Sequence, residues 1–574
     1  MTENIPQDPK SPLLQAGTDA DNSSADNDFD DLVRKAHDHH LAGLFGEAEH
    51  LYREVLQSRP DAAEILSKLG AALAVQGKFI EAVSALRRAI EKDPELAEAH
   101  NNLGSVFQIQ GKLDNAVVSL RRALDITPDQ AAAHINLGNI LSKQGSLEEA
   151  VESYRKALKI DPESTQALNG FGAAMIQQNK GAEAAEAFGR ALEITPDQPE
   201  TLSNLGSLLR NQGKYDDAVE TLRKAVAVEP KLTEAHINLG NALKSRGDWD
   251  AAIDAYQHAI SLEPDNAEIH WKQAQVLLMT GRFREGWAEY QWRTRCDDFQ
   301  SLIWNVPGTP WDGSRLDGKT ILIYCEQNFG DSIQFVRYAE TLAALGGTVV
   351  VKCPPQLQTL FQNVPGVDRV VTHLDRSVIY GVQASLLSLP GLLGTDMESI
   401  PATVPYFKPP AAPNRKLDGN GKLKVGIAWA GSPAHKNDQN RSISLPLFKS
   451  LLDVEGFAFY GLQVGERSRD IARFGMSESI NDQSRTLGNF TATASVMEEL
   501  DLIISVDTSV AHLAGALGKP VWTLLPFAPD WRWLLGRDDS PWYPSMRLFR
   551  QPSPDDWQGV LEKVETALRQ RLLN

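Results

Sequence analysis

The sequence is short of cysteine, of positive charge and of long apolar runs, and each shortage excludes a class of protein. Its three cysteines, Cys296, Cys325 and Cys353, are odd in number and widely spaced in 574 residues, so neither a disulfide framework nor a cysteine metal site is indicated. Lys and Arg total 57 against 75 Asp and Glu, a net charge of −18. This balance argues against nucleic acid as a partner, because phosphate binding requires clustered basic residues. No run reaches the roughly 18–20 apolar residues of a membrane span.

The first residues lack the basic and apolar regions of a signal peptide, so we expect a cytoplasmic protein. Segment 1–28 is rich in Asp, Asn, Ser and Pro, which favours a disordered acidic tail. A chain of this length exceeds one hydrophobic core and should divide into several domains.

A period of 34 residues runs through the first half of the chain. In each unit an apolar residue and a glycine are followed, at fixed distances, by an alanine and a proline. An earlier unit ends at Pro60 and a degraded one runs from Ala267 to about Gln300, which makes eight units. The pairs are Leu69-Gly70, Leu103-Gly104, Leu137-Gly138, Phe171-Gly172, Leu205-Gly206 and Leu239-Gly240.

Each unit has the signals of two helices joined by a tight turn. Glycines such as Gly77, Gly111 and Gly145 end the first helix, and the proline ends the second. A single pair cannot bury its apolar face, so neighbouring pairs must stack. The pattern resembles the tetratricopeptide repeat (TPR) family, and this implies an α-helical superhelix, an α-solenoid with a concave groove, over residues 29–300.

Asparagines recur at one position of the first helix of several repeats. An amide offers two donors and an acceptor, so a row of amides can hold the backbone of an extended peptide. The row is similar to that of the eukaryotic O-linked N-acetylglucosamine transferase, which implies a protein ligand; Lys68 and Gly170 interrupt it. The alternative is that these side chains bond between neighbouring repeats. The residues are Asn102, Asn136, Asn204 and Asn238, with Asn139 and Asn241 one turn further on.

After residue 300 the pattern changes to strands alternating with helices, which predicts an α/β fold. Apolar runs at 319–325, 348–351 and 369–372 indicate a first Rossmann-like lobe, which we assign to 301–410. Runs at 424–429, 457–463, 502–506 and 521–525 indicate a second at 411–574. We expect an amphipathic helix over 555–573 to cross back to the first lobe. Two such lobes suggest the GT-B arrangement, in which a ligand binds at the carboxyl ends of the strands.

Three segments of this half are recognisable: GDSIQFVRYA at 330–339, GIAWAGSPAHKNDQNRSISL at 426–445, and DLIISVDTSVAHLAGALGKPVW at 501–522. They resemble bacterial TPR-fused glycosyltransferases whose catalytic half is similar to lipopolysaccharide heptosyltransferases. A subgroup with this layout glycosylates flagellin. Two departures stand out: 489–493 reads NFTAT where the family has two aspartates, and 380–385 (YGVQAS) lacks the usual Asp and His.

The resemblance implies a donor site that holds a nucleotide-sugar through its phosphates. Free amides at a helix N-terminus make an anion site, and the loop after the second lobe's first strand adds cations and donors, so no metal or other cofactor is needed. We expect Gln463 to contact the base or the ribose of the nucleotide. The donor-binding candidates are Gly330, Trp429, Gly431, Ser432, Lys436, Asn437, Arg441, Ser442, Gln463, Asp507, Thr508, Ser509 and His512.

Asp331 is the candidate catalytic base. Its position matches the Gly-Asp motif of the heptosyltransferases, and a carboxylate there could take the proton of an acceptor hydroxyl. Gln327 and Gln334 flank it and are expected to orient substrates. The alternative for Asp331, as for Asp507, is a structural role as a helix N-cap.

The sequence therefore predicts an inverting, metal-independent protein O-glycosyltransferase whose repeats hold the acceptor protein, with flagellin a candidate. Two other hypotheses stay open: a TPR scaffold with a degenerate transferase half, and an enzyme acting on a glycan or lipid. The Trp-rich segments 530–533 and 540–543 fit either sugar stacking or core packing. The donor sugar, its nucleotide, the acceptor residue and an oligomer formed through the repeats are undecided.

Overall fold

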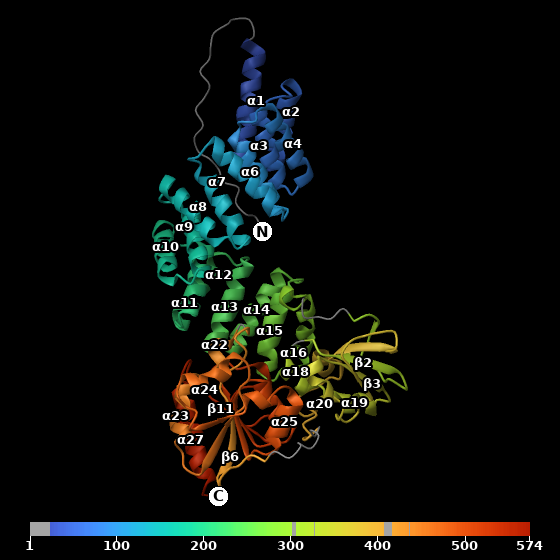
Figure 1. Cartoon of the computed structure of the whole chain (residues 1–574). Coiled ribbons are helices and arrows are strands. Elements are labelled where there is room, and N and C mark those ends of the chain that lie inside the picture. The colour runs from blue at the N-terminus through green and yellow to red at the C-terminus, as the bar shows by residue number, and fades with distance from the viewer. Residues whose placement is uncertain (1–22, 301–305, 327, 407–415, 436, 574) are drawn as a thin grey trace. The chain divides into compact units, whose positions relative to one another are not determined.

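The structure is a computed structural model that describes residues 23–300, 306–326, 328–406, 416–435 and 437–573. By its internal contacts the chain separates into two compact units, Met1–Ala242 and Leu243–Asn574, so the division falls inside the repeats (Figure 1). The first helix, α1, begins at Ser23, and the predicted disordered tail is therefore wrong for residues 23–28. The rest of that tail lies outside the described residues.

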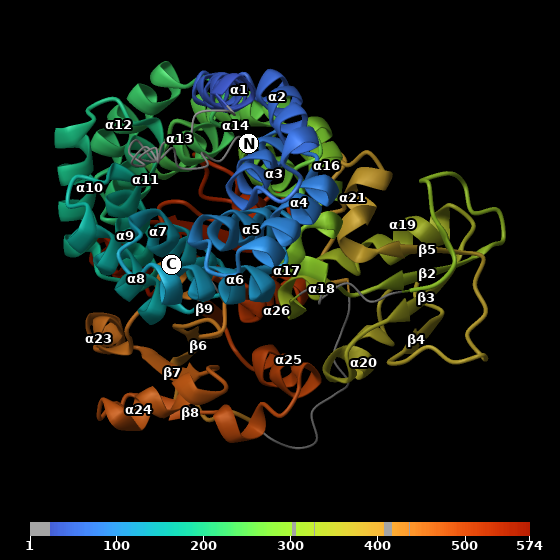
Figure 2. The same cartoon turned by 90° about the horizontal axis from the view of Figure 1, so that it is seen from above.

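Sixteen helices of the described chain form eight consecutive pairs, as predicted (Figure 1). Those of the first unit wind around a common axis when seen from above (Figure 2). The helices are α1 (Ser23–Leu41), α2 (Phe45–Ser58), α3 (Ala63–Val75), α4 (Phe79–Lys92), α5 (Ala97–Ile109), α6 (Leu113–Ile126), α7 (Ala131–Lys143), α8 (Leu147–Ile160), α9 (Thr165–Gln177), α10 (Gly181–Ile194), α11 (Pro199–Asn211), α12 (Tyr215–Val228), α13 (Thr233–Arg246), α14 (Trp249–Leu262), α15 (Ala267–Met279) and α16 (Phe283–Tyr290).

The turn inside each pair uses a left-handed backbone conformation. Gly111 has φ of 72°, and Asn179 takes the same place in the fifth repeat with φ of 60°, which asparagine tolerates better than most residues. The glycine of each apolar-glycine pair makes room for a large side chain of the second helix. A Cβ on Gly104 would lie 2.7 Å from Cγ of Leu120. The turn thus favours glycine for its backbone conformation, and the apolar-glycine pair requires it for the space that a missing Cβ leaves.

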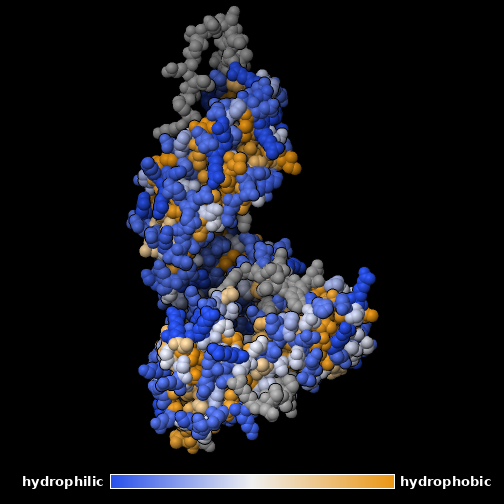
Figure 3. All heavy atoms as spheres, viewed as in Figure 1, coloured by the Kyte–Doolittle hydropathy of each residue, from blue (hydrophilic) through white to orange (hydrophobic). Residues whose placement is uncertain are grey.

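A histidine of several repeats bonds to the proline loop before it. Its Nε2 lies 2.8–3.0 Å from the proline carbonyl oxygen six residues earlier, at His100, His134, His236 and His270. The sequence reasoning missed this link although the histidines share the 34-residue period. Exposed apolar side chains such as Ile80 and Val118 are scattered over a mostly hydrophilic surface (Figure 3).

The second unit contains two parallel sheets. All the predicted strands are present, whereas β1, β5, β8 and β11 were not predicted because they are short or rich in polar residues. The first sheet has the order β1-β5-β2-β3-β4 and the second the order β11-β10-β9-β6-β7-β8. The strands are β1 (Thr309–Pro310), β2 (Thr320–Tyr324), β3 (Thr348–Lys352), β4 (Arg369–Val371), β5 (Val382–Ser385), β6 (Leu423–Ala428), β7 (Phe457–Gly461), β8 (Ile480–Asp482), β9 (Leu502–Val506), β10 (Val521–Leu525) and β11 (Met546–Arg550).

Short helices and 3-10 turns connect these strands. Between β2 and β3 the chain forms two short helices, α18 and α19. The segments are η1 (Gln291–Arg295), α17 (Asp297–Gln300), α18 (Phe329–Phe335), α19 (Tyr338–Ala344), α20 (Pro355–Phe361), η2 (Leu386–Ser388), α21 (Leu389–Leu392), α22 (Asp438–Arg441), η3 (Leu445–Phe448), α23 (Lys449–Leu452), η4 (Glu466–Arg469), α24 (Asp470–Arg473), η5 (Ser484–Thr486), α25 (Phe490–Glu498), α26 (Ser509–Ala516), η6 (Trp531–Trp533) and α27 (Trp557–Arg571).

The C-terminal helix α27 differs from its expected course. Its buried face, with Val560 and Val564, belongs to the same apolar cluster as Val425 of β6 and Phe448 of η3. It therefore packs on the second sheet instead of crossing to the first. Among the described residues no helix is long and apolar enough to span a membrane.

Candidate active site

The second sheet brings two of the predicted loops side by side. Strands β6 and β9 are hydrogen-bonded neighbours, although they are the first and fourth strands of this sheet along the chain. In such a sheet the order reverses at this point, and ligands bind in the crevice outside the carboxyl ends of the two strands. The loops that follow are 429–442 after β6 and 507–509 after β9, which hold most of the donor-binding candidates.

The loop after β9 opens helix α26. Thr508 is the N-cap, with a side chain that accepts from the backbone N–H of Val510 at 3.3 Å, so Asp507 is not the cap. The Oδ1 of Asp507 lies 3.9 Å from Nε2 of His512, one turn into the helix. The other imidazole nitrogen, Nδ1, is hydrogen bonded to the hydroxyl of Tyr543 at 3.0 Å. The contact with Tyr543 fixes the imidazole ring. Because Thr508 is the N-cap, the Asp507 carboxyl has no capping role.

The loop after β6 holds Arg441 against the loop after β9. Arg441 donates from Nη1 to the backbone oxygen of Asp507 at 3.2 Å, and a Cβ on Gly431 would lie 2.6 Å from Nη2. A Cβ at position 431 would therefore displace this guanidinium from its place against the loop backbone. Gly431 donates its N–H to Oγ of Ser442 at 2.9 Å. The Nε of Arg441 is buried and has no hydrogen-bond acceptor among the described residues.

Two of the donor-binding candidates, Gln463 and Trp429, form contacts that support the loop after β6. The carboxamide of Gln463 accepts from the N–H groups of Trp429 and Ala430 and donates to the oxygen of Ala430 at 3.0 Å. The ring of Trp429 is fully buried, and its Nε1 donates to Asp470 at 3.2 Å. Both side chains are thus engaged with protein atoms.

The remaining loop candidates are more exposed. Ser432 and Asn437 lie on the surface of the loop, and Oδ1 of Asn437 accepts from Asn440 at 2.7 Å. Lys436 and Gln327 lie outside the described residues.

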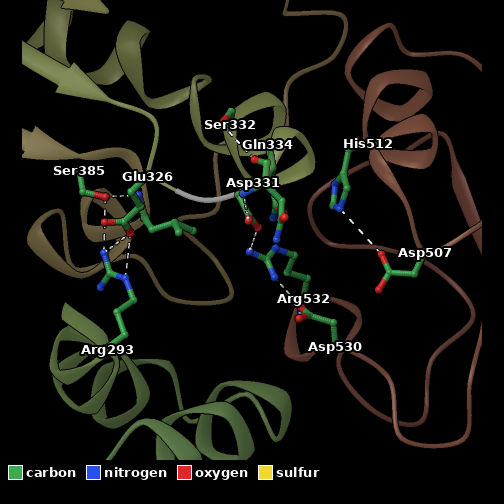
Figure 4. A network of polar contacts seen from close by, with 12 residues as sticks. Arg293, Glu326, Asp331, Ser332, Gln334, Ser385, Asp507, His512, Asp530 and Arg532 are labelled. Carbon is green, nitrogen blue, oxygen red and sulfur yellow. Dashed lines mark hydrogen bonds and ion pairs between the residues drawn. The ribbon is translucent and has the colours of Figure 1, made fainter. Parts of the chain in front are cut away.

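Asp331 belongs to helix α18, which follows the central strand of the first sheet. Asn328 is the N-cap of α18, and Asp331, three residues on, completes a capping box by accepting from the Asn328 N–H at 3.1 Å. Its other oxygen is paired with Nη2 of Arg532, which comes from η6 of the second sheet's half (Figure 4). Asp331 is therefore not the N-cap of its helix, as the structural alternative had it. It is the N3 residue of a capping box and also forms an ion pair.

Helix α18 also touches helix α26. A Cβ on Gly330 would lie 2.8 Å from Cδ2 of His512, so this glycine lets the two helices approach. Phe329 packs on Phe490 of α25, with ring centroids 4.9 Å apart. Asn489 caps α25 by accepting from the N–H of Ala492 at 2.9 Å. Candidates from both sheets thus meet within one compact unit.

Burial controls the titration of this cluster. It raises the pKa of the Asp331 carboxyl, and the Arg532 guanidinium opposes that rise. Burial and then the Asp530 carboxylate raise the pKa of Asp507 to about 6. Burial and the neighbouring arginines, first of all Arg532, hold the pKa of His512 well below its usual value. The imidazole is therefore neutral near pH 7, and both carboxyls are more basic than an exposed aspartate.

Arg532 is the site residue that sequence reasoning missed. It is 7% exposed and donates to Asp331, to Oε1 of Gln334 at 2.8 Å and to Asp530 at 2.7 Å. The segment 530–533 drew attention only for its tryptophans. Nothing in the local sequence indicates that Arg532 pairs with a carboxylate 201 positions away. The aromatic residues Trp531, Trp533, Trp542 and Tyr543 are buried, which favours the packing interpretation over stacking on a sugar.

The asparagine row lies in the first unit and links repeats. Asn136 donates from Nδ2 to Oδ1 of Asn101 at 3.0 Å, and Asn102, Asn204 and Asn238 bond in the same way to the residue 35 positions earlier. Oδ1 of Asn139 accepts from the hydroxyl of Tyr154 at 2.7 Å, whereas Asn241 has contacts of its own. A Cβ on Gly170 would lie 2.5 Å from the Tyr154 ring, which explains the interruption there. In the part of the chain that the structure describes, Oδ1 of Asn102, Asn136, Asn204 and Asn238 accepts no protein hydrogen bond.

Sequence comparisons match the repeats and the α/β part of the chain to different families. Models described as TPR repeat match residues 73–111 and 240–281, and models described as tetratricopeptide repeat match 95–163, 143–205 and 203–260. The model for glycosyltransferase family 9 (heptosyltransferase) matches residues 486–533, which include Asp507, His512 and Arg532. Together with the relative described next, these matches support a TPR-fused, glycosyltransferase-like protein.

One curated relative is Protein FlbA of Caulobacter vibrioides. It is 26% identical over 52% of this chain and 54% of its own length, so the chain spans about half of the curated relative that it matches. Solved structures resemble parts of the chain, with low scores. They include the Cut9-Hcn1 complex (18% identity, 48% of this chain, 54% of that one, TM-score 0.41) and PilF of Pseudomonas aeruginosa (26%, 38%, 99%, 0.33).

Proposed function

We propose that the chain is a protein O-glycosyltransferase with a GT-B-like catalytic half. It would transfer a sugar from a nucleotide-sugar to a Ser or Thr of a protein held by the repeats. One observation carries the proposal: the loops after β2, β6 and β9 bring Asp331, Arg441 and Asp507 with His512 into one cluster at the carboxyl ends of parallel strands.

The donor phosphates would bind between Arg441 and the N-terminus of α26. Arg441 has a buried Nε without an acceptor, and the first N–H groups of a helix attract an anion. Thr508 and Ser509 add hydroxyl groups beside them. These donors would stabilise the negative charge that develops on the leaving phosphate, so the proposal requires no metal ion.

Asp331 would act as the general base. The acceptor hydroxyl oxygen attacks C1 of the sugar, the bond from C1 to the phosphate oxygen breaks, and the hydroxyl proton passes to the carboxylate. Attack on the side opposite to the leaving group inverts the anomeric centre. The Asp331 pKa, raised by burial, makes this carboxylate a stronger base than an exposed aspartate.

The repeats would bind the acceptor protein. The free Oδ1 atoms of Asn102, Asn136, Asn204 and Asn238 could accept from peptide N–H groups while their Nδ2 atoms hold adjacent repeats together. Such contacts recognise a backbone and leave side chains to be read elsewhere. Flagellin is a candidate acceptor because of the resemblance of the whole layout.

The donor site is tested by thermal unfolding of the purified chain with UDP, GDP, ADP, dTDP and CMP. We expect one nucleotide to raise the unfolding temperature, and Arg441→Gln and His512→Ala to abolish the effect. Arg537→Gln is the matched control, because Arg537 is paired with Asp539 on the surface. If no nucleotide stabilises the wild type, the transferase proposal fails and the scaffold hypothesis replaces it.

A further inference from the structure

Arg532 contacts the candidate base and two polar side chains beside it. Its Nη2 pairs with Asp331, its Nε donates to Gln334 at 2.8 Å, and its Nη1 donates to Asp530 at 2.7 Å. Figure 4 shows the guanidinium between the two carboxylates. All three directions of the planar group are thus used, which fixes its position more firmly than a single ion pair would.

The segment that carries Arg532 is held in a strained backbone conformation. Leu534, directly after η6, has φ of 53° and is buried. A leucine in this region is costly and persists only where the surroundings impose it. Arg550 imposes it in part by donating to the backbone oxygens of Arg537 and Trp533. Strain of this kind concentrates at functional sites.

The terminal repeat, formed by α15 and α16, packs against the segment that carries Arg532. The ring of Trp531, next to Arg532, meets Trp287 edge to face with centroids 5.2 Å apart, and Tyr290 at 5.9 Å. A second link reaches the other side of Asp331. Arg293 of η1 forms a buried ion pair with Glu326, two residues before the N-cap of α18, with its Nε 2.9 Å from Oε1 (Figure 4).

We propose that Arg532 is the positioning residue that keeps the Asp331 carboxylate oriented and ionised for proton transfer, and that the terminal repeat holds Arg532 in place through Trp531. The inference rests on the proposed function, because it assigns Asp331 the role of base. It adds that the repeat next to the catalytic half is part of the catalytic apparatus, beyond any role in binding an acceptor.

The charges around the pair make the direction of the effect clear. Besides burial, Asp530 and Glu326 raise the pKa of Asp331, and Arg532 is the largest influence that lowers it. Other titratable groups also face the pair. They are Tyr290 on α16, Cys325 after β2, His435 after β6, Asp507 after β9, His512 on α26 and Tyr543 before β11. Without Arg532 the carboxyl would stay protonated to a higher pH.

The test is the pH dependence of sugar transfer, measured with the nucleotide-sugar whose nucleotide stabilises the wild type. In Arg532→Gln we expect the acid limb of kcat/KM to move up by about one pH unit or more, with Arg532→Lys in between. Trp287→Leu, which touches neither Asp331 nor a substrate, should shift the limb in the same direction but less. Arg537→Gln and Arg282→Gln, on the same loop and the same repeat, should leave it unchanged.

An equal loss of rate at every pH, with the limb unmoved, would show a merely structural role and overturn the inference. A measurement without substrate separates this failure from that of the proposed function. The coupling between Asp331→Asn and Arg532→Gln in urea unfolding should be favourable at pH 7 and fall as the pH drops through the pKa of Asp331. A coupling that is absent or independent of pH would overturn the inference even if the chain transfers no sugar.

Discussion

The repeat array and the candidate active site are built on different scales of sequence separation. In the array, Asn136 bonds to a residue 35 positions away, and the same bond recurs in other repeats. In the site, Asp331 pairs with a residue 201 positions away, and nothing repeats. The array can therefore lose one contact and keep its form, whereas the site depends on single contacts between distant segments.

The largest expected effect comes from Asp331→Asn. An amide cannot accept the acceptor proton, so sugar transfer should fall by about 10²–10⁴-fold, while stabilisation by the donor nucleotide is retained. Transfer rate and thermal shift are measured on the same preparation. Asp539→Asn, at an exposed pair with Arg537, is the control. Unchanged transfer in Asp331→Asn would mean that another group is the base.

Asp507→Asn should stabilise the fold at neutral pH. Because burial raises the folded-state pKa of Asp507 to about 6 from 3.8, the unfolded chain ionises first, and stability is lost as the pH rises through this window. Removing the charge should raise the free energy of unfolding at pH 7 by up to about 3 kcal/mol. Urea unfolding at several pH values measures the difference, which should vanish below pH 4. A variant less stable than the wild type at pH 7 would contradict this account.

Gly104→Ala should weaken the array without reaching the site. The new Cβ would lie 2.7 Å from Leu120, and such overpacking costs about 2 kcal/mol. Gly111→Ala, with open space around it but φ of 72°, should cost about 1 kcal/mol for a different reason. Both are measured by urea unfolding. If either variant changed nucleotide binding, the contrast between local array and non-local site would be broken.

The smallest effect is expected for Asn136→Leu. It removes hydrogen bonds to Asn101 and to Ser105 at 3.2 Å, worth about 1 kcal/mol of local stability. Acceptor binding should weaken as well, because the free Oδ1 is lost, and donor binding should not change. Asn115→Leu, on the exposed face of α6, is the control. An acceptor affinity equal to that of the control would leave the row with its inter-repeat role alone.

The same contrast explains what the sequence could predict. Helix pairs and turn residues such as Gly111 were predictable because the period repeats each signal, and buried strands such as β9 because apolar runs announce them. Strand β8, with the sequence IND, escaped because little in its composition marks a strand.

The pairing of Asp331 with Arg532 escaped for a different reason: it exists only after two sheets and a terminal repeat have packed together. Resemblance supplied Asp331, Asp507 and His512, but not the Arg532 guanidinium that pairs with Asp331, nor the contact of the neighbouring Trp531 with Trp287. The asparagine row was predicted to hold a peptide, and that remains a prediction; its Nδ2 atoms bond between neighbouring repeats, as the alternative stated.

The most direct test of the account compares sugar-bearing peptides, by mass spectrometry, in cells that express the wild type or Asp331→Asn in place of the native chain. We predict that Ser or Thr residues of one or a few proteins carry a sugar with the wild type and lose it with Asp331→Asn. Identical modified peptides in both, or a sugar that disappears only from a lipid or glycan, would contradict the claim that this chain glycosylates a protein.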